Sequence, residues 1–234
     1  MKSLQILLLL CTFGVFCSAQ ETFKPVKISV YYSVYCDNCR AFFTAKFGPY
    51  YERFKSWIDL DLIPFGNSTH KDEGNFEFDC ENGPDECVAN KWHTCANWIY
   101  KARYPEEVAN FVNCTLWRDD KFFDDIADCA EKFRLDFLPI QHCVNEIEGS
   151  IHLAANAART REHVPEITSY PTIDFNGTFD QDLQDLAVMD FKAAICSLIK
   201  NPDTGAKPDE CNGALMMVPF YSVIILALGL LLRV

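Results

Sequence analysis

Basic residues are scarce in this sequence: 21 lysines and arginines stand against 33 aspartates and glutamates, for a formal net charge of −12. A chain this acidic is not expected to bind nucleic acid or an anionic lipid surface through its bulk charge, because both are themselves negative. Internal repeats and low-complexity segments are also absent from the sequence. We therefore expect one globular domain, with an insertion, around one hydrophobic core.

The usual ligand patterns of zinc sites are missing too. A single Cys-X-X-Cys is present, at Cys36 and Cys39, so no second pair completes a zinc ribbon, and no His-x-x-x-His motif occurs. None of the five histidines has metal-ligand or triad spacing. His142 next to Cys143 raises a cysteine-hydrolase alternative, but we expect Cys143 to belong to a disulfide. The sequence therefore predicts no metal site.

Cys36 and Cys39 lie between a strand pattern and a helix pattern. Residues 26–32 alternate branched apolar with polar side chains, as in a half-buried strand, and Phe43 and Phe47 begin an aromatic run at helical spacing. This places the pair at a helix N-terminus, where free N–H groups and the helix dipole stabilise a thiolate. Because the thiolate is the form that attacks disulfides, we interpret the pair as redox-active. The alternative is a structural disulfide.

The order of the predicted elements indicates an α/β domain with a thioredoxin-like fold, which we place at residues 20–200. A second alternating strand follows at 58–65, and strand signals return at 172–175 before a turn signal. Between these strands, at about 67–165, apolar residues recur at helical spacing. We therefore expect a large disulfide-bonded helical insertion between the second and third core strands.

Three further expectations concern the helices. Gly48-Pro49 should kink or split the first helix, because proline removes a helical hydrogen bond. A later helix is predicted over 144–158, with Ile147 and Ile151 in the core. An amphipathic helix over 183–198 is expected to close the domain.

Pro171 stands directly before the strand at 172–175. In a thioredoxin-like site, a proline at the start of the third core strand faces the redox cysteines, and the peptide bond before it is cis. A proline there also leaves neighbouring backbone groups free to pair with an extended substrate. We therefore assign Pro171 to the same site as Cys36 and Cys39, with an ordinary strand-entry proline as the alternative.

Both ends of the chain are hydrophobic. Residues 1–19 have the pattern of a secretory signal peptide. A linker at 201–214 precedes a second apolar segment at 215–234, which predicts either a GPI-anchor signal, with Asn212 as the attachment residue, or a transmembrane anchor. We therefore expect contact with a membrane through this tail.

Cysteines and glycosylation motifs favour the secretory pathway. Twelve cysteines, less the two at positions 11 and 17 in the predicted signal peptide, leave ten, an even number that fits a redox pair plus four structural disulfides. The eight structural candidates, with about 105 possible pairings, are Cys80, Cys87, Cys95, Cys114, Cys129, Cys143, Cys196 and Cys211. Three Asn-x-Ser/Thr motifs predict glycosylation at Asn67, Asn113 and Asn176. We expect a secreted, endosomal or lysosomal, or cell-surface protein.

The segment from Cys80 to Cys95 carries the pattern Cys-x-x-Gly-x-x-Glu-Cys-x-x-Asn-x-x-x-x-Cys. It resembles the signature of the gamma-interferon-inducible lysosomal thiol reductases, and the upstream Cys-X-X-Cys and the downstream Tyr170-Pro171 extend the match over about 26–200. Two features depart from the family pattern. The family signature usually has Gln-His where this chain has Glu81-Asn82, and Cys211 and the tail lie outside it.

This resemblance implies an enzyme, an oxidoreductase that reduces the disulfides of protein substrates, often at acidic pH. Cys36 would be the attacking thiolate, Cys39 the resolving thiol and Pro171 the substrate-facing residue. A small-molecule thiol or other external reductant would regenerate the pair, and no metal or nucleotide cofactor is implied. The alternative is a non-catalytic, surface-anchored binding glycoprotein in which Cys36–Cys39 is a structural bridge.

Acidic operation would place a demand on the thiolate. An ordinary thiol titrates near pH ~8.5, so lowering that by about three units needs roughly 4 kcal/mol, of which a helix dipole supplies at most ~2. Arg40 is the nearest candidate cation for the remainder, and its alternative role is that of a solvated surface residue. Asp37, between the cysteines, opposes the thiolate when it is ionised.

Overall fold

The computed structural model describes residues 23–71, 76–117 and 122–212. The predicted signal peptide and the hydrophobic tail therefore lie outside the described residues. Among the helices that are described, none is both long enough and apolar enough to cross a membrane.

A four-stranded sheet with the order β2-β1-β5-β6 forms the centre of the domain. β1 (Val26–Tyr32) pairs in parallel with β2 (Ile58–Pro64) and antiparallel with β5 (Thr172–Phe175), which in turn pairs with β6 (Thr178–Phe179). This is the thioredoxin-like arrangement expected from the order of the elements. Because β1 is central and parallel to β2, a helical crossover must join them, and that crossover carries the two cysteines.

The crossover is one continuous helical segment with a widened turn in its middle. It consists of α2 (Asp37–Ala41), the π-helical turn η1 (Phe42–Phe47), α3 (Gly48–Phe54) and the short 3-10 turn η2 (Lys55–Trp57). Pro49 lies in the first turn of α3 and has no N–H to donate to a carbonyl of the preceding turn. That preceding turn is the widened, π-helical η1. The predicted interruption is therefore a π-helical turn rather than a break.

The insertion between β2 and β5 begins with strands and continues with helices. A two-stranded hairpin, β3 (Ser68–Lys71) with β4 (Glu77–Cys80), precedes the helices α4 (Pro84–Tyr100), α5 (Pro105–Trp117), α6 (Phe122–Lys132), α7 (Phe137–Asn145) and α8 (Ile147–Arg161). The prediction that the insertion is helical from about residue 67 onward was wrong for this first part. The four residues of β3 are all polar, and β4 alternates polar with apolar residues over only four positions, the shortest run that indicates a strand.

Two helix predictions also need correction. The helix expected over 144–158 is divided at Glu146, whose extended backbone separates α7 from α8. Ile147 and Ile151 are 63% and 47% exposed, because α8 buries a different face that includes Leu153. The closing helix is likewise divided into α9 (Gln181–Met189) and α10 (Phe191–Leu198). Asp190 causes this division, since its side chain accepts a hydrogen bond from the Ala193 N–H and so caps α10.

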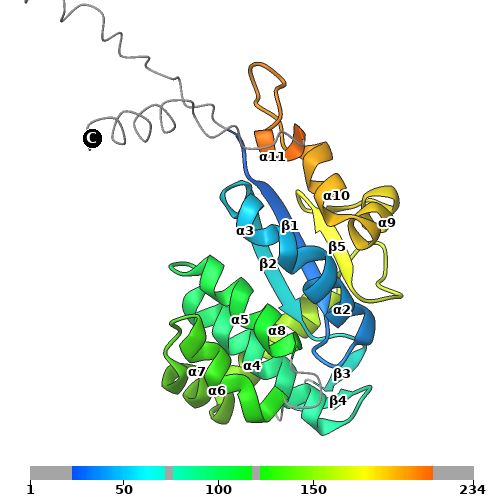
Figure 1. Ribbon diagram of the computed structural model, residues 1–234. Helices are drawn as coiled ribbons and strands as arrows, with labels where there is room; N and C mark the ends of the chain where they lie inside the picture. Colours follow the sequence, from blue (N-terminus) through cyan, green and yellow to red (C-terminus); the bar gives the residue numbers. More distant parts are fainter. Residues whose placement is uncertain (1–22, 72–75, 118–121, 213–234) are drawn as a thin grey trace, which may run out of the picture.

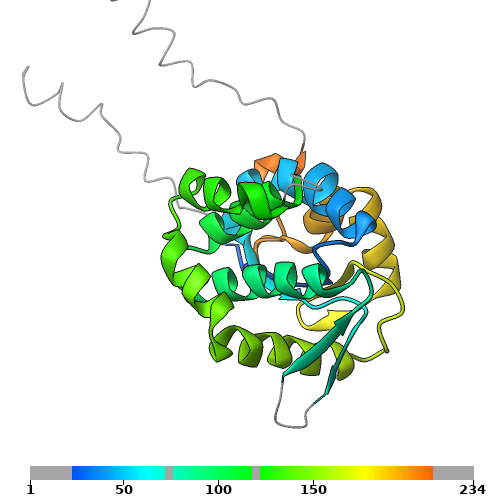
Figure 2. The same ribbon diagram turned by 90° about the horizontal axis from the view of Figure 1, so that it is seen from below.

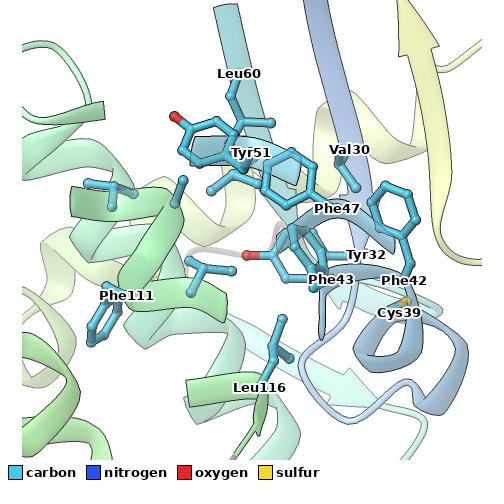
Figure 3. Packing of buried hydrophobic residues seen from close by; sticks show 14 of the residues in the cluster. Val30, Tyr32, Cys39, Phe42, Phe43, Phe47, Tyr51, Leu60, Phe111 and Leu116 are labelled. Atoms are coloured by element: carbon cyan, nitrogen blue, oxygen red, sulfur yellow. The ribbon is translucent and has the colours of Figure 1, made fainter. Parts of the chain in front are cut away.

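The helices flank the sheet on two sides. The insertion lies beside β2, whereas α9 and α10 lie on the side of β5 (Figure 1). The β3–β4 hairpin projects from the body of the molecule (Figure 2). The core between β1 and the crossover is aromatic, with Tyr32, Phe43 and Phe47 buried together and Cys39 at the edge of this cluster (Figure 3). The crossover is therefore anchored by a large apolar surface, which holds its first turn in place.

Every cysteine of the described residues lies in a disulfide. Besides Cys36–Cys39, the bridges are Cys80–Cys87, Cys95–Cys143, Cys114–Cys129 and Cys196–Cys211. Three of them lie within the insertion, and Cys196–Cys211 ties the short helix α11 (Asp209–Asn212) to α10. Chain order contains no information about these pairings, which are decided by which helices pack together.

Candidate active site

The two sulfurs of the dithiol occupy different environments at the start of α2. Cys36 is the N-cap residue, with extended backbone, and its Sγ accepts a hydrogen bond from the Cys39 N–H at 3.1 Å. The two residues form a disulfide with their Cα atoms 5.2 Å apart. Cys39 is 0% exposed, whereas Cys36 is only partly buried. A molecule in solution can therefore reach Cys36 but not Cys39.

The strand entry at Pro171 lies next to Cys36. The Tyr170–Pro171 peptide bond is cis, and the Cys36 Sγ lies 3.7 Å from the Tyr170 carbonyl oxygen. Pro171 itself is buried. The backbone group that contacts the Cys36 sulfur is the carbonyl of Tyr170, the residue before it. The chain thus brings together Cys36, Cys39 and the Tyr170–Pro171 turn, which are more than 130 positions apart in the sequence.

Gln184 on α9 holds this turn in place. Its Nε2 donates to the Pro171 carbonyl oxygen at 2.9 Å, and its Oε1 accepts from the Ile173 N–H at 2.8 Å. Gln184 is buried, so both hydrogen bonds are shielded from water. The sequence reasoning missed this residue, because a single glutamine on an amphipathic helix gives no signal of its own.

The charged residues beside the cysteines pair with each other. Arg40 Nη1 lies 3.8 Å from Asp37 Oδ1, and the Asp37 side chain is 93% exposed. Arg40 is therefore placed to offset the charge of Asp37, whereas the hydrogen bond recorded on the Cys36 sulfur comes from the Cys39 N–H. Since the pair is near solvent, its electrostatic effect is weakened by water and salt.

Two tyrosines near the site are held in the neutral form. Burial raises the pKa of Tyr170 to about 12, and the charge of Glu81 adds to this rise. The pKa of Tyr35 is raised as well, first by burial and then by the charges of Asp85 and Glu86. Neither phenol therefore ionises between acidic and neutral pH, so neither places a negative charge beside the dithiol.

Neither His142 nor His93 takes part in the dithiol site. Cys143 is bridged to Cys95, so it is not available as the nucleophile of a Cys143–His142 hydrolase pair. His93 is completely buried, and its two ring nitrogens contact the Tyr32 hydroxyl at 3.0 Å and the Thr115 hydroxyl at 2.7 Å. Burial lowers the pKa of His93 to about 3, so it remains a neutral core residue in mild acid.

The predicted modification sites differ in exposure. Asn67 and Asn176 are both exposed. Asn113 is only partly exposed on α5, where its amide packs so close to Gly48 that a Cβ there would come within 2.7 Å of it. Asn212 is exposed at the end of α11, and the apolar segment that would define its role as an anchor site lies outside the described residues.

Two cavities lie at different distances from the dithiol. A cavity of about 470 Å³ includes Tyr170 and Gly66 in its lining. Another, of about 700 Å³, is lined by residues of β2, α4 and α8, and neither cavity has a cysteine in its lining. In the lining of the larger cavity, Asp61 contacts Arg159 and, at 2.8 Å, Lys101. The smaller cavity shares Tyr170 with the site, because the Tyr170 carbonyl oxygen lies 3.7 Å from the Cys36 Sγ.

The chain is similar to known proteins over most of its length. Residues 27–133 match the family described as gamma interferon inducible lysosomal thiol reductase (GILT). A gamma-interferon-inducible lysosomal thiol reductase-like protein from Anopheles gambiae is 30% identical over 241 residues, which cover 97% of this chain and 94% of that protein. The gamma-interferon-inducible lysosomal thiol reductase of Carassius auratus is 30% identical, over 82% of this chain and 74% of its own.

Among solved structures, Chlamydia trachomatis DsbA matches with a TM-score of 0.48 and 16% identity, over 67% of this chain and 77% of that chain. The sequence relatives carry the assignment, because the match to the Anopheles protein extends over nearly the whole of both chains. The chain belongs to the gamma-interferon-inducible lysosomal thiol reductase family.

Proposed function

We propose that this protein reduces disulfide bonds of protein substrates with the Cys36–Cys39 dithiol. Family membership and the thioredoxin-like fold support thiol–disulfide oxidoreductase chemistry in general. The observation that carries the finer proposal is the asymmetry of the pair. Cys36 is accessible at a helix N-terminus and receives a backbone N–H, whereas Cys39 is buried within reach of it.

The reaction proceeds in two exchange steps. The Cys36 thiolate attacks one sulfur of the substrate disulfide, so a mixed disulfide forms and one substrate thiolate leaves and takes up a proton. Cys39 then loses its proton and attacks the Cys36 sulfur, which releases the second substrate thiol and leaves Cys36–Cys39 oxidised. Two thiol groups of an external reductant, which become a disulfide themselves, supply the two electrons and two protons that restore the dithiol. Neither step calls on a metal or a nucleotide.

The Tyr170–Pro171 turn supplies the substrate side of the site. The Tyr170 carbonyl, 3.7 Å from the Cys36 sulfur, is free to accept an N–H from an extended substrate segment that lies across the turn. Pro171 has no backbone N–H of its own and shapes the turn. The Gln184 side chain fixes this turn by donating a hydrogen bond to the Pro171 carbonyl oxygen. In this proposal, Pro171 acts through its backbone geometry rather than through an exposed side chain.

An insulin-type disulfide reduction assay at acidic pH tests this function. Cys36→Ser should abolish activity, because it removes the attacking sulfur. Cys39→Ser should accumulate a mixed disulfide between Cys36 and the substrate, visible on a non-reducing gel, because the resolving thiol is missing. Unchanged activity in Cys36→Ser would overturn the proposal and leave the bridge as a structural one in a binding protein. The reduction potential of the pair separates a reductase from an isomerase or oxidase.

We also propose that the protein acts within the secretory or endolysosomal route and is held at a membrane through its C-terminal tail. Five disulfides support a lumenal or extracellular setting. Treating intact cells with a phosphatidylinositol-specific phospholipase should release the protein if Asn212 carries a lipid anchor. Retention on the membrane would contradict the lipid anchor and favour a transmembrane tail.

A further inference from the structure

Two buried polar side chains near the start of α4 face the loop that carries Cys36. Glu86 is 2% exposed and Asn90 is 0% exposed. A buried polar group without a hydrogen-bond partner destabilises the fold, and a charged one does so more strongly. Such side chains therefore need specific partners, and these partners show which parts of the chain α4 holds together.

Asn90 joins the ends of two strands. Its Oδ1 accepts from the Val34 N–H at 2.9 Å, just after β1, and its Nδ2 donates to the Phe65 carbonyl oxygen at 3.2 Å, just after β2. The same Nδ2 lies 3.2 Å from the Ser33 hydroxyl. One amide thus fixes the backbone two residues before Cys36 relative to the neighbouring strand.

Glu86 holds the adjacent residue. Its carboxylate accepts from the Ser33 hydroxyl, and on the other side from the backbone N–H and the side-chain amide of Asn82, at 2.8 and 3.1 Å. Asn82 lies in the turn that the Cys80–Cys87 disulfide closes. The carboxylate therefore links the Ser33 loop to a turn that is itself covalently restrained.

Packing at Ser33 leaves little room for movement. Gly66 has φ +70°, and a Cβ at that position would come within 2.4 Å of the Ser33 Cβ. The Ser33 carbonyl oxygen in turn accepts from the Cys36 N–H at 3.4 Å. Any shift of Ser33 is thus transmitted directly to the backbone of Cys36.

We infer that Glu86 and Asn90 are positioning residues for the dithiol, an inference that rests on the reductase function proposed above. They hold the segment from Ser33 to Cys36 so that the Cys36 sulfur receives the Cys39 N–H and lies beside the Tyr170 carbonyl. Both are named positions of the Cys80–Cys95 signature, so the signature couples the insertion to the active site. Asn82, where the family usually has histidine, serves here as a neutral donor to Glu86.

The experiment compares four variants of the full chain with the wild type: Glu86→Ala, Glu86→Gln, Asn90→Ala and, as a matched control, Asn97→Ala. Asn97 lies on the same helix and donates to the carbonyl of Leu62 in β2, at 3.3 Å, but it makes no recorded contact with the Ser33 loop. The readout is the alkylation rate of Cys36 in the reduced protein at fixed pH, followed by mass spectrometry, together with the reduction potential.

We expect Glu86→Ala and Asn90→Ala to slow alkylation of Cys36 by tenfold or more, because a loose loop removes the N–H bond that stabilises the thiolate. Asn97→Ala should change the rate by less than twofold. Glu86→Gln should retain most of the wild-type rate, since its amide oxygen still accepts from the Asn82 backbone N–H and its amide nitrogen donates to Ser33, with only the bond from the Asn82 side chain lost. If Glu86→Ala does not fold, Ser33→Ala removes the hydroxyl alone and should slow alkylation by threefold or more.

The inference would be overturned if two single variants both kept the wild-type alkylation rate: Asn90→Ala, and either Glu86→Ala or its substitute Ser33→Ala. A Glu86→Gln variant as slow as Glu86→Ala would also overturn it, because the charge rather than the geometry would then be at work. Alkylation needs no protein substrate, so these outcomes remain distinct from a failure of the wild type to reduce insulin, which would refute only the proposed reductase activity.

Discussion

The structural disulfides should stabilise the protein according to the lengths of the loops that they close. Cys95–Cys143 spans 48 positions, Cys80–Cys87 spans 7, and Cys114–Cys129 and Cys196–Cys211 each span 15. Removing a bridge by changing both cysteines to alanine releases the unfolded chain from that loop. The loop-entropy relation then predicts that the free energy of unfolding falls by about 4 kcal/mol for the loop of 48 positions, about 3 kcal/mol for each loop of 15 and about 2 kcal/mol for the loop of 7.

The burial of the cysteines should distinguish the two bridges whose loops have equal length. Cys114 and Cys129 are 7% and 0% exposed, whereas Cys211 is only partly buried near the end of the described chain. Replacing the buried sulfurs also leaves a cavity, which adds to the loss. We therefore expect the double variant at Cys114 and Cys129 to lose more stability than the one at Cys196 and Cys211, although their loop terms are the same.

Urea unfolding at neutral pH without reductant measures these differences, with Cys36–Cys39 kept oxidised in every variant. The free energy of unfolding should fall most for Cys95→Ala with Cys143→Ala and least for Cys80→Ala with Cys87→Ala. A loss at Cys95–Cys143 no larger than that at Cys80–Cys87 would refute the reasoning from loop length. Equal losses for the two 15-residue loops would refute the burial term alone.

Two further predictions concern charged groups. Asp37→Asn should raise the alkylation rate of Cys36 at neutral pH, because it removes a negative charge beside the attacking sulfur; the pairing with Arg40 should limit the change to a few-fold, and an unchanged rate would contradict it. His93, whose pKa burial lowers to about 3, takes up a proton mainly on unfolding. Stability should therefore fall by about 1 kcal/mol per pH unit below about pH 6.5. His93→Gln should flatten that slope in urea unfolding from pH 7 to 4, and an unchanged slope would argue against this role.

Local pattern determined the central part of the fold. The alternation over residues 26–32 and the aromatic spacing from Phe43 predicted β1 and the crossover helix, because side chains within one element repeat with its own period. Cys36 and Cys39 followed as the residues at the junction. The resemblance at Cys80–Cys95 predicted the family, which the comparisons confirm.

Local pattern failed where polar residues or caps decide the structure. The strands of the β3–β4 hairpin have only four residues each, all of them polar in β3, and the break between α9 and α10 depends on one capping bond to Asp190. The exposure of Ile147 reflects which face of α8 meets its neighbours, and the sequence of a single helix does not specify this. In each case the deciding contact comes from a partner or a single side chain rather than from a repeated pattern.

The sequence by itself determined that two thiols open a helix after a central strand and that a proline begins a later one. Only the tertiary structure decided which cysteines pair, that Gln184 holds the Pro171 turn, and that Glu86 and Asn90 reach Ser33 and Val34. The physical reason is distance along the chain. Helix and strand periods act over a few residues, whereas the hydrogen bonds of Gln184, Glu86 and Asn90 to these segments span 11 to 57 positions, which only packing brings together.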